Sequence, residues 1–322
     1  MSDPRDEFLE NVVFKNVNIK EHPNIAFLCG GNPASVLDKV SNKYKFLSIR
    51  AYISTKLTID YPNLYFKNAE DVKDWNSYSV YDNLIEFEKD IAHICKTIVL
   101  FVESAGSIAE LGSFAIIPEI TEKLLVYVDQ KYSGANSFLT LGPLKKLKDQ
   151  ESENVNYIPW SKEILNIDNT EIEVMVEGSM REWDKNVCEQ ISNALNKAVR
   201  RDRDSEEYNR SKEMLFIHDL IILYKAVTEK ELFGYFKIVS HNINKKEISR
   251  SLFSLIKLDL IQSVEKGNET FFIPYDKSGK RFISLAGSGD SARLSVGLAK
   301  YYEHNSHLAR RDAIAQVRES AA

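Results

Sequence analysis

Runs of consecutive apolar residues, closed by small or polar residues, recur through the first half of the chain. Helical periodicity separates them, most clearly over residues 81–95 and 106–120. Strands that are apolar throughout are typical of parallel sheets covered on both faces, since a strand with one wet face alternates instead. The pattern therefore predicts an α/β fold with a parallel, Rossmann-like sheet. Its four predicted strands are residues 24–31, 45–53, 96–103 and 123–129.

From about residue 160 the pattern changes to helices, the clearest of which spans residues 180–199. The charged run at 200–210 is typical of a solvated helix end or linker, so we expect a domain boundary near residue 205. A last helix is predicted at 292–304. The chain is thus divided into a sheet domain, a helical extension, a second domain and a helical tail. Their predicted limits are 1–160, 161–204, 205–286 and 287–322.

The second domain has the pattern of a winged helix. Three predicted helices are followed by a β-hairpin at 261–275, which turns at Gly267-Asn268. The second helix begins with a capping-box pair, Thr228 and Glu231. Three helices and a hairpin in this order predict a C-terminal winged-helix domain. The helices are predicted at 212–227, 228–239 and 245–261.

Composition narrows the class of protein. The 322 residues are enough for two cores, and 43% hydrophobic with 28% charged residues argues against disorder. The net charge of −5 offers no overall attraction to nucleic acid. The apolar runs are shorter than the roughly 20 residues of a membrane-spanning helix, and we expect a cytoplasmic protein. The three cysteines are widely spaced and form no CxxC pair, so we expect buried thiols, no metal site and no cofactor.

The stretch "FVESAGSIAELGSFA", residues 101–115, places a carboxylate directly after a predicted buried strand. If a helix begins near Ser107, Glu110 lies in its first turn, where the helix dipole favours an ionised carboxylate. Such a group suits nucleophilic attack at a sugar carbon. Gly106 and Ser107 add small size, backbone N–H groups and a hydroxyl for a phosphate or sugar oxygen. Alternatively, Ser107 and Glu110 are a plain capping box with a structural role only.

The motif G-[ST]-x-x-E-x-G after a buried strand resembles that of the nucleoside 2-deoxyribosyltransferase family and its hydrolase relatives. Three segments, "IAFLCGG", "IVLFVESAGSIAELGSFA" and "SFLTLGPLKKL", occur in this order before the predicted winged helix. Together they resemble the effector proteins of bacterial retrons, anti-phage systems that pair a reverse transcriptase with a branched RNA–DNA molecule, msDNA. The resemblance covers residues 25–148. It implies a nucleoside deoxyribosyltransferase-like sheet domain.

The resemblance implies roles for individual residues around the motif. Glu110 would be the catalytic nucleophile, with Gly106 and Ser107 forming the turn beside it. Deoxyribosyltransferases have an Asp six residues before the nucleophile, where this chain has Ser104. The neighbouring Glu103 is therefore a candidate acid that protonates the leaving base, or alternatively a solvated carboxylate at a strand end.

Further candidates lie outside the motif. Cys29, Gly30 and Gly31 would line the pocket, where missing side chains let a nucleotide approach the backbone. Related enzymes take a second acidic residue from the helix before the third strand, and Glu88 matches better there than Asp90. The alternative for both carboxylates is a solvated position on that helix.

The last winged-helix helix carries basic residues on one face and apolar residues on another. Lys246, Arg250 and Lys257 form the basic face, which is the arrangement of a helix that contacts nucleic-acid phosphates. Residues 206–281 contain 13 basic and 11 acidic residues, so non-specific DNA affinity should be weak. The alternatives to nucleic-acid contact are that this basic face is only solvated, or that it binds protein.

These observations favour an enzyme over a binding module. In the first hypothesis, the chain is a toxic retron effector that cleaves or transfers the N-glycosidic bond of a nucleotide, nucleoside or NAD-like dinucleotide. The resemblance implies that the reverse transcriptase and msDNA hold it inactive, and homo-oligomers are possible. In the second, it is a non-catalytic, nucleotide-sensing, DNA-binding regulator. A nucleotide phosphoribohydrolase is less favoured, because residues 103–105 are "ESA" where those enzymes have "PGG".

Overall fold

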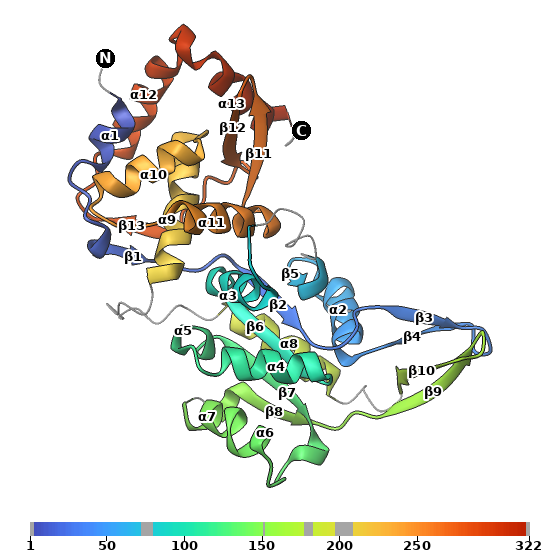
Figure 1. Ribbon diagram of the computed structural model, residues 1–322. Coiled ribbons are helices and arrows are strands. Elements are labelled where there is room, and N and C mark those ends of the chain that lie inside the picture. Colours follow the sequence, from blue (N-terminus) through green and yellow to red (C-terminus); the bar gives the residue numbers. More distant parts are fainter. Residues whose placement is uncertain (1–2, 72–79, 151, 177–182, 197–208, 320–322) are drawn as a thin grey trace. The chain divides into compact units, whose positions relative to one another are not determined.

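The structure is a computed structural model that describes residues 3–71, 80–150, 152–176, 183–196 and 209–319 (Figure 1). The chain forms two compact units, and each is assembled from separate stretches of sequence. The sheet unit contains Pro23–Asp74 and Cys95–Ala198. The helical unit contains Met1–His22, Trp75–Ile94 and Val199–Ala322. The predicted domain limits assume continuous stretches and stay a prediction, and the boundary near residue 205 lies outside the described residues.

The sheet unit is built on a five-stranded parallel sheet with the strand order β5-β2-β6-β7-β8. This confirms the predicted α/β class, and the predicted strands at 24–31, 96–103 and 123–129 correspond to β2, β6 and β7. Residues of β2 and β6 are buried along their whole length, as the continuous apolar runs indicated. The strands are β2 (Ile25–Cys29), β5 (Tyr65–Asn68), β6 (Thr97–Val102), β7 (Leu124–Asp129) and β8 (Val155–Ile158).

The predicted strand at 45–53 is wrong, because most of it is the start of a helix. Strand β4 (Lys43–Phe46) ends first, and α2 (Ile49–Asp60) begins after Ser48, whose side chain accepts a hydrogen bond from the Ala51 N–H. A short apolar run cannot distinguish a buried helix from a buried strand. The remaining helices of this unit are α4 (Ala105–Phe114), α5 (Pro118–Thr121), α6 (Phe138–Leu141), α7 (Pro143–Gln150) and α8 (Asp184–Asn196).

Two antiparallel hairpins extend side by side from the sheet unit (Figure 1). One consists of β3 (Ser35–Asp38) and β4, and the other of β9 (Lys162–Ile167) and β10 (Thr170–Met175). Lys39 and Asp168 form an ion pair of 3.0 Å between them. The second hairpin corrects the expectation that helices follow from residue 160, since the described residues 162–167 and 170–175 are strands.

The helical unit has the predicted succession of helices and hairpin. The turn at Gly267-Asn268 is confirmed, because Lys266 pairs with Glu269 and Gly267 has a φ of +64°. The Thr228–Glu231 capping box is confirmed as well. The predicted elements are α3 (Leu84–Ile94), α9 (Asn209–Tyr224), α10 (Glu229–Ile238), α11 (Lys245–Lys257), β11 (Ile261–Lys266), β12 (Glu269–Pro274) and α12 (Ser291–Tyr302). The unit also contains α1 (Pro4–Leu9), β1 (Val17–Ile19), β13 (Ile283–Leu285) and α13 (Leu308–Glu319).

The strand order fixes where a ligand site is expected. The chain runs from β2 outward to β5 and then crosses to β6 on the other side of β2. In open parallel sheets, ligands bind at the carboxyl ends of the strands where the order reverses. That point lies between Cys29 at the end of β2 and Val102 at the end of β6. Within the described ranges, no helix is both long and apolar enough to cross a membrane.

Candidate active site

The turn between β6 and α4 is closed by two serines. Ser104 is the N-cap of α4: its hydroxyl accepts a hydrogen bond from the Ser107 N–H at 3.1 Å, and the Ser107 hydroxyl accepts one from the Ser104 N–H at 2.9 Å. Helix α4 begins at Ala105, two residues before the expected start near Ser107. Glu110 is the sixth residue of the helix, beyond the first turn where the dipole acts. The alternative of a Ser107–Glu110 capping box is wrong.

These contacts give Ser107 a role in shaping the turn. The residue is fully buried, and its hydroxyl also accepts a hydrogen bond from the Glu103 N–H at 3.0 Å and donates one to the Ser104 carbonyl oxygen at 2.9 Å. Gly106, by contrast, is exposed, and a Cβ there would meet only the Ser104 hydroxyl, at 3.7 Å. Substrate contact by Ser104, Gly106 and Ser107 stays a prediction.

Glu110, on α4, is a partly buried carboxylate with one unbonded oxygen among the described residues. Its Oε2 is buried and has no hydrogen-bond partner within the part of the chain that the structure describes. Burial raises the pKa of Glu110 to about 7, an effect that Arg50 opposes and Glu70 reinforces. The raised pKa runs against the expected preference for the ionised form, because burial outweighs the nearby cation.

Arg50, which the sequence analysis did not identify, is fully buried at the start of α2. Its guanidinium donates to the Leu28 carbonyl oxygen at 3.3 Å and to the Gly31 carbonyl oxygen, and it forms an ion pair with Glu70. The available signal was an arginine inside the apolar run "FLSIRAYI". A buried cation needs partners, and here they come from the end of β2 and from Glu70.

Glu103 holds the backbone at the ends of β2 and β6 together. Its carboxylate accepts hydrogen bonds from the N–H groups of Gly31 at 3.0 Å, Ile49 at 2.8 Å and Arg50 at 3.2 Å. Burial raises the pKa of Glu103, and these three bonds oppose the rise. The alternative of a solvated strand-end carboxylate is wrong. The role of Glu103 as a proton donor stays a prediction, and its contacts favour a positioning role.

The last residue of β2 and the two glycines after it do not form the open pocket wall that the sequence predicts. Cys29 is fully buried within the strand. A Cβ on Gly31 would lie 2.8 Å from the Ser48 Cβ and 2.9 Å from the Glu103 Cδ. The space left by the missing side chain at Gly31 is thus filled by the protein itself, and contact of Cys29, Gly30 or Gly31 with a substrate stays a prediction.

A cavity of about 520 Å³ lies on another side of α4. Glu103, Ser104 and Ile108 line it, together with Lys131 and Trp160 among others. Glu110 is not among its lining residues, because positions two apart on a helix point in different directions. The carboxyl edge of the sheet therefore offers two neighbouring environments: a polar cavity beside Ser104, and the buried group of Glu110, Arg50 and Glu70.

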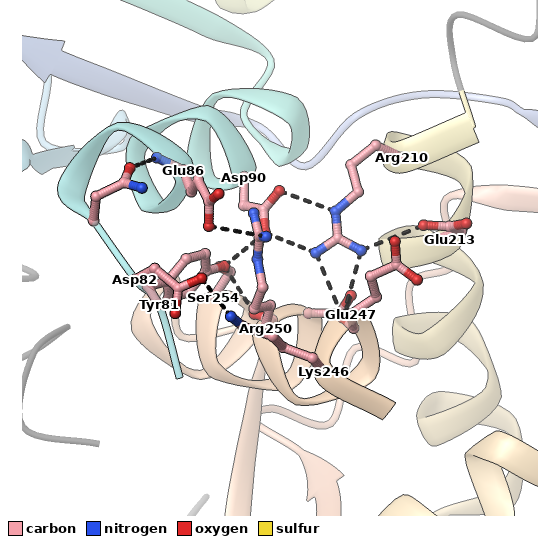
Figure 2. Close-up of polar contacts among 12 residues, drawn as sticks. Tyr81, Asp82, Glu86, Asp90, Arg210, Glu213, Lys246, Glu247, Arg250 and Ser254 are labelled. Atoms are coloured by element: carbon pink, nitrogen blue, oxygen red, sulfur yellow. Dashed lines mark hydrogen bonds and ion pairs between the residues drawn. The ribbon is translucent and has the colours of Figure 1, made fainter. Parts of the chain in front are cut away.

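The candidates on α3 belong to the helical unit, not to the unit that holds Glu110. Glu88 and Asp90 are both buried, so the alternative of solvated positions is wrong. Asp90 accepts two hydrogen bonds from the Arg210 guanidinium, at 2.9 and 2.7 Å, and one from Arg250 at 3.1 Å (Figure 2). A contact between Glu88 and a substrate stays a prediction.

The predicted nucleic-acid face of α11 is occupied by carboxylates of the same unit (Figure 2). Lys246 donates to Asp82 at 2.5 Å, and Arg250 donates to Glu86 at 3.2 Å as well as to Asp90. Lys257 lies over the Phe253 ring, 5.3 Å from its centroid. The basic residues do share one region of α11, and Lys246 and Arg250 are paired with carboxylates of the same unit.

Comparisons with known proteins agree on one family. The model of the STM3845 retron effector protein family matches residues 47–263. The chain is 24% identical over 255 residues to an Escherichia coli protein named as a candidate ribosyltransferase/DNA-binding protein of retron Ec73, covering 76% of this chain and 75% of the relative. It is 30% identical over 142 residues to the corresponding Escherichia coli protein of retron Ec86, covering 44% of this chain and 42% of that one.

Proposed function

This chain belongs to the retron effector family, and we propose that it is an enzyme that cleaves or transfers the N-glycosidic bond of a nucleotide, nucleoside or NAD-like dinucleotide. Glu110 is the nucleophile in this proposal. The observation that carries it is the buried Oε2 of Glu110, which has no hydrogen-bond partner among the described residues and lies near the carboxyl end of a parallel sheet. The ribosyltransferase names of the two relatives support the same chemistry.

The proposed reaction needs Glu110 in its ionised form. One carboxylate oxygen attacks the anomeric carbon, the bond from that carbon to the base nitrogen breaks, and the base leaves with the bonding electrons and takes up a proton. Water or a second base then releases the sugar from the carboxylate. Desolvation strengthens a nucleophile, and the buried Arg50 supports the charge while the substrate is absent.

The surrounding residues position this group. In the proposal, Glu103 fixes the Gly31 loop and the start of α2, and the Ser104–Ser107 pair fixes the start of α4. The positioning role of Glu103 is supported by its three backbone hydrogen bonds, which occupy both oxygens. The leaving base then takes its proton from solvent, or from Glu103 once the substrate is bound.

The helical unit is proposed to be a winged-helix module that contacts nucleic acid. Helices α9, α10 and α11 followed by the β11–β12 hairpin have the order of such a module, and both relatives carry DNA-binding in their names. In a retron, the partners would be the reverse transcriptase and msDNA, which hold the effector inactive until infection. A non-catalytic, nucleotide-sensing regulator is the second candidate, because the same helical unit would serve it.

Substitution of Glu110 separates the two candidates. Purified wild-type protein and Glu110→Gln would be incubated with nucleosides, nucleotides and NAD, and free base would be measured by chromatography. We expect base release by the wild type and a loss on the order of 10³-fold or more in the variant, because the nucleophile is gone. Glu171→Gln, at an exposed position of the same unit, is the matched control. Base release that survives in Glu110→Gln at the wild-type rate would exclude the nucleophile role.

A further inference from the structure

The basic face of α11 and the acidic side of α3 form one continuous set of ion pairs in the helical unit (Figure 2). Glu86 and Asp90 are four residues apart and so lie on one side of α3, and Asp82 precedes Glu86 by four. Lys246 and Arg250 have the same spacing on α11. Asp82 lies just before α3, so only Glu86 and Asp90 share the helical spacing of Lys246 and Arg250, but each cation has at least one carboxylate partner.

One end of this contact is buried. Asp90 is 2% exposed and accepts hydrogen bonds from Arg210, from Arg250 and from the Tyr81 hydroxyl at 2.7 Å. Arg250 also lies over the Tyr81 ring, 4.7 Å from its centroid. Phe87, on the same helix, is fully buried. Breaking a buried and fully bonded ion pair is costly, so this end anchors α3 to the helical unit.

The other end is open to solvent. The side chains of Asp82 and Lys246 are 66% and 49% exposed, and that of Glu86 is 38% exposed. Exposed ion pairs contribute little to stability, because water and salt screen them. Lys246 can therefore exchange Asp82 at small cost. The Arg250 side chain is 18% exposed, and its Nε stays bonded to Asp90, so only its Nη1 contact with Glu86 can be exchanged in the same way.

We propose that Asp82 and Glu86 are an internal competitor for nucleic acid: they occupy Lys246 and Arg250 in place of phosphates, and a bound polyanion takes over both cations while Asp90 keeps α3 anchored. This rests on the proposed nucleic-acid contact of α11. Phosphates attract the same cations with the added gain of releasing their counterions. The basic face of α11 is then an interaction surface that Asp82 and Glu86 cover when no nucleic acid is bound. A bound nucleic acid displaces the two carboxylates, which therefore lower the affinity of α11 for it.

Binding of a short DNA duplex at low salt tests the competition. The double variant Asp82→Asn/Glu86→Gln should bind about threefold to tenfold more tightly than the wild type, because two competing charges are removed. The variant Glu10→Gln/Asp312→Asn changes the net charge equally at exposed positions of the same unit and should change the affinity much less. Lys246→Gln should weaken binding and reduce the salt dependence by about one ion.

Hydrogen exchange gives a second measurement on the unmodified chain. Added duplex should speed exchange at the start of α3, where Glu86 loses its partner, and leave the amides around Asp90 unchanged. If Lys246→Gln weakens binding but the double carboxylate variant binds like its control, the competition is excluded and the α11 contact stands. If Lys246→Gln binds as well as the wild type, the α11 contact itself fails, and the competition with it.

Discussion

The buried carboxylate of Asp90 and the partly buried carboxylate of Glu110 have opposite surroundings. Asp90 receives hydrogen bonds from two arginines and a tyrosine, and these outweigh the effect of burial, so its pKa lies below the ordinary value. Glu110 has the charge of Arg50 nearby, but its Oε2 has no hydrogen-bond partner among the described residues, and burial raises its pKa to about 7.

The difference separates a structural carboxylate from a candidate reactive one. A buried charge with a full set of donors is costly to disturb, because loss of one partner leaves the others uncompensated, and it has few lone pairs left for a substrate. A buried oxygen without a donor costs stability, and such costs are typical of functional sites. Glu103 is the intermediate case, since it is partly buried and bonded to three backbone N–H groups. Glu103 and Glu110 are both partly buried, so the hydrogen bonds to their oxygens, rather than their exposure, distinguish them.

Removal of the satisfied carboxylate should have the largest effect on stability. Asp90→Ala leaves Arg210 and Arg250 without their shared buried partner, so we expect a loss of about 3–5 kcal/mol in the free energy of unfolding. Urea unfolding followed by circular dichroism would measure it. Asp82→Asn removes a carboxylate from the exposed end of the same contact and should leave the curve almost unchanged. Equal unfolding midpoints for both variants would contradict the assigned role of Asp90.

Neutralisation of Glu110 should increase the free energy of unfolding, whereas loss of Asp90 decreases it. The pKa of Glu110 rises from 4.5 to about 7 on folding, so its stabilising effect is complete below pH 4.5 and lost as the pH rises through 7. Glu110→Gln should therefore raise the free energy of unfolding by about 2–3 kcal/mol near pH 8. Near pH 5 the variant and the wild type should be nearly equal. Thermal unfolding at both pH values checks this, and a variant that is less stable near pH 8 would contradict it.

A smaller effect is expected from the charge beside Glu110. Glu70 raises the pKa of Glu110, so Glu70→Gln should lower it, by about one unit at most. If Glu110 is the nucleophile, base release rises with pH through its pKa, and this rise should move to lower pH in the variant. The pH dependence of kcat/KM measures the shift, with Glu171→Gln as the control. A shift to higher pH would contradict the electrostatic link between the two carboxylates.

Much of the fold could be predicted from local patterns, and the exceptions have local causes. Strands β2 and β6 are buried along their length and β7 is buried at all positions but Leu125, so their sequences are apolar almost without a break. The segment 45–53 is also rich in apolar residues, but Ser48 caps a helix there, so the apolar positions belong mainly to the start of α2. The hairpin β9–β10 was not predicted, because most of its residues are exposed or partly buried in a charged stretch and only Val174 and Met175 are buried.

The candidate site could be predicted in part, because its motif is local while its partners are not. Glu110 and the small residues before it lie in one stretch of 15 residues, 101–115. Arg50 and Gly31, which interact with Glu110 or Glu103, are separated from them in sequence by 53 residues or more. No local pattern indicates such contacts. In the same way, the basic spacing on α11 was visible, whereas the acidic residues that occupy it come from a segment more than 150 residues earlier.

The interleaved make-up of the two units has a consequence for biosynthesis. The sheet unit is complete once residue 198 has left the ribosome, but α1, β1 and α3 pack with partners that come from residues 199–322. Chains grow at about 5–20 residues per second, so these early segments wait for several seconds with apolar side chains such as Phe87 uncovered. A pause in translation or a premature stop beyond residue 198 would leave a finished sheet unit carrying an unpaired α3, which is a natural target for chaperones and proteases.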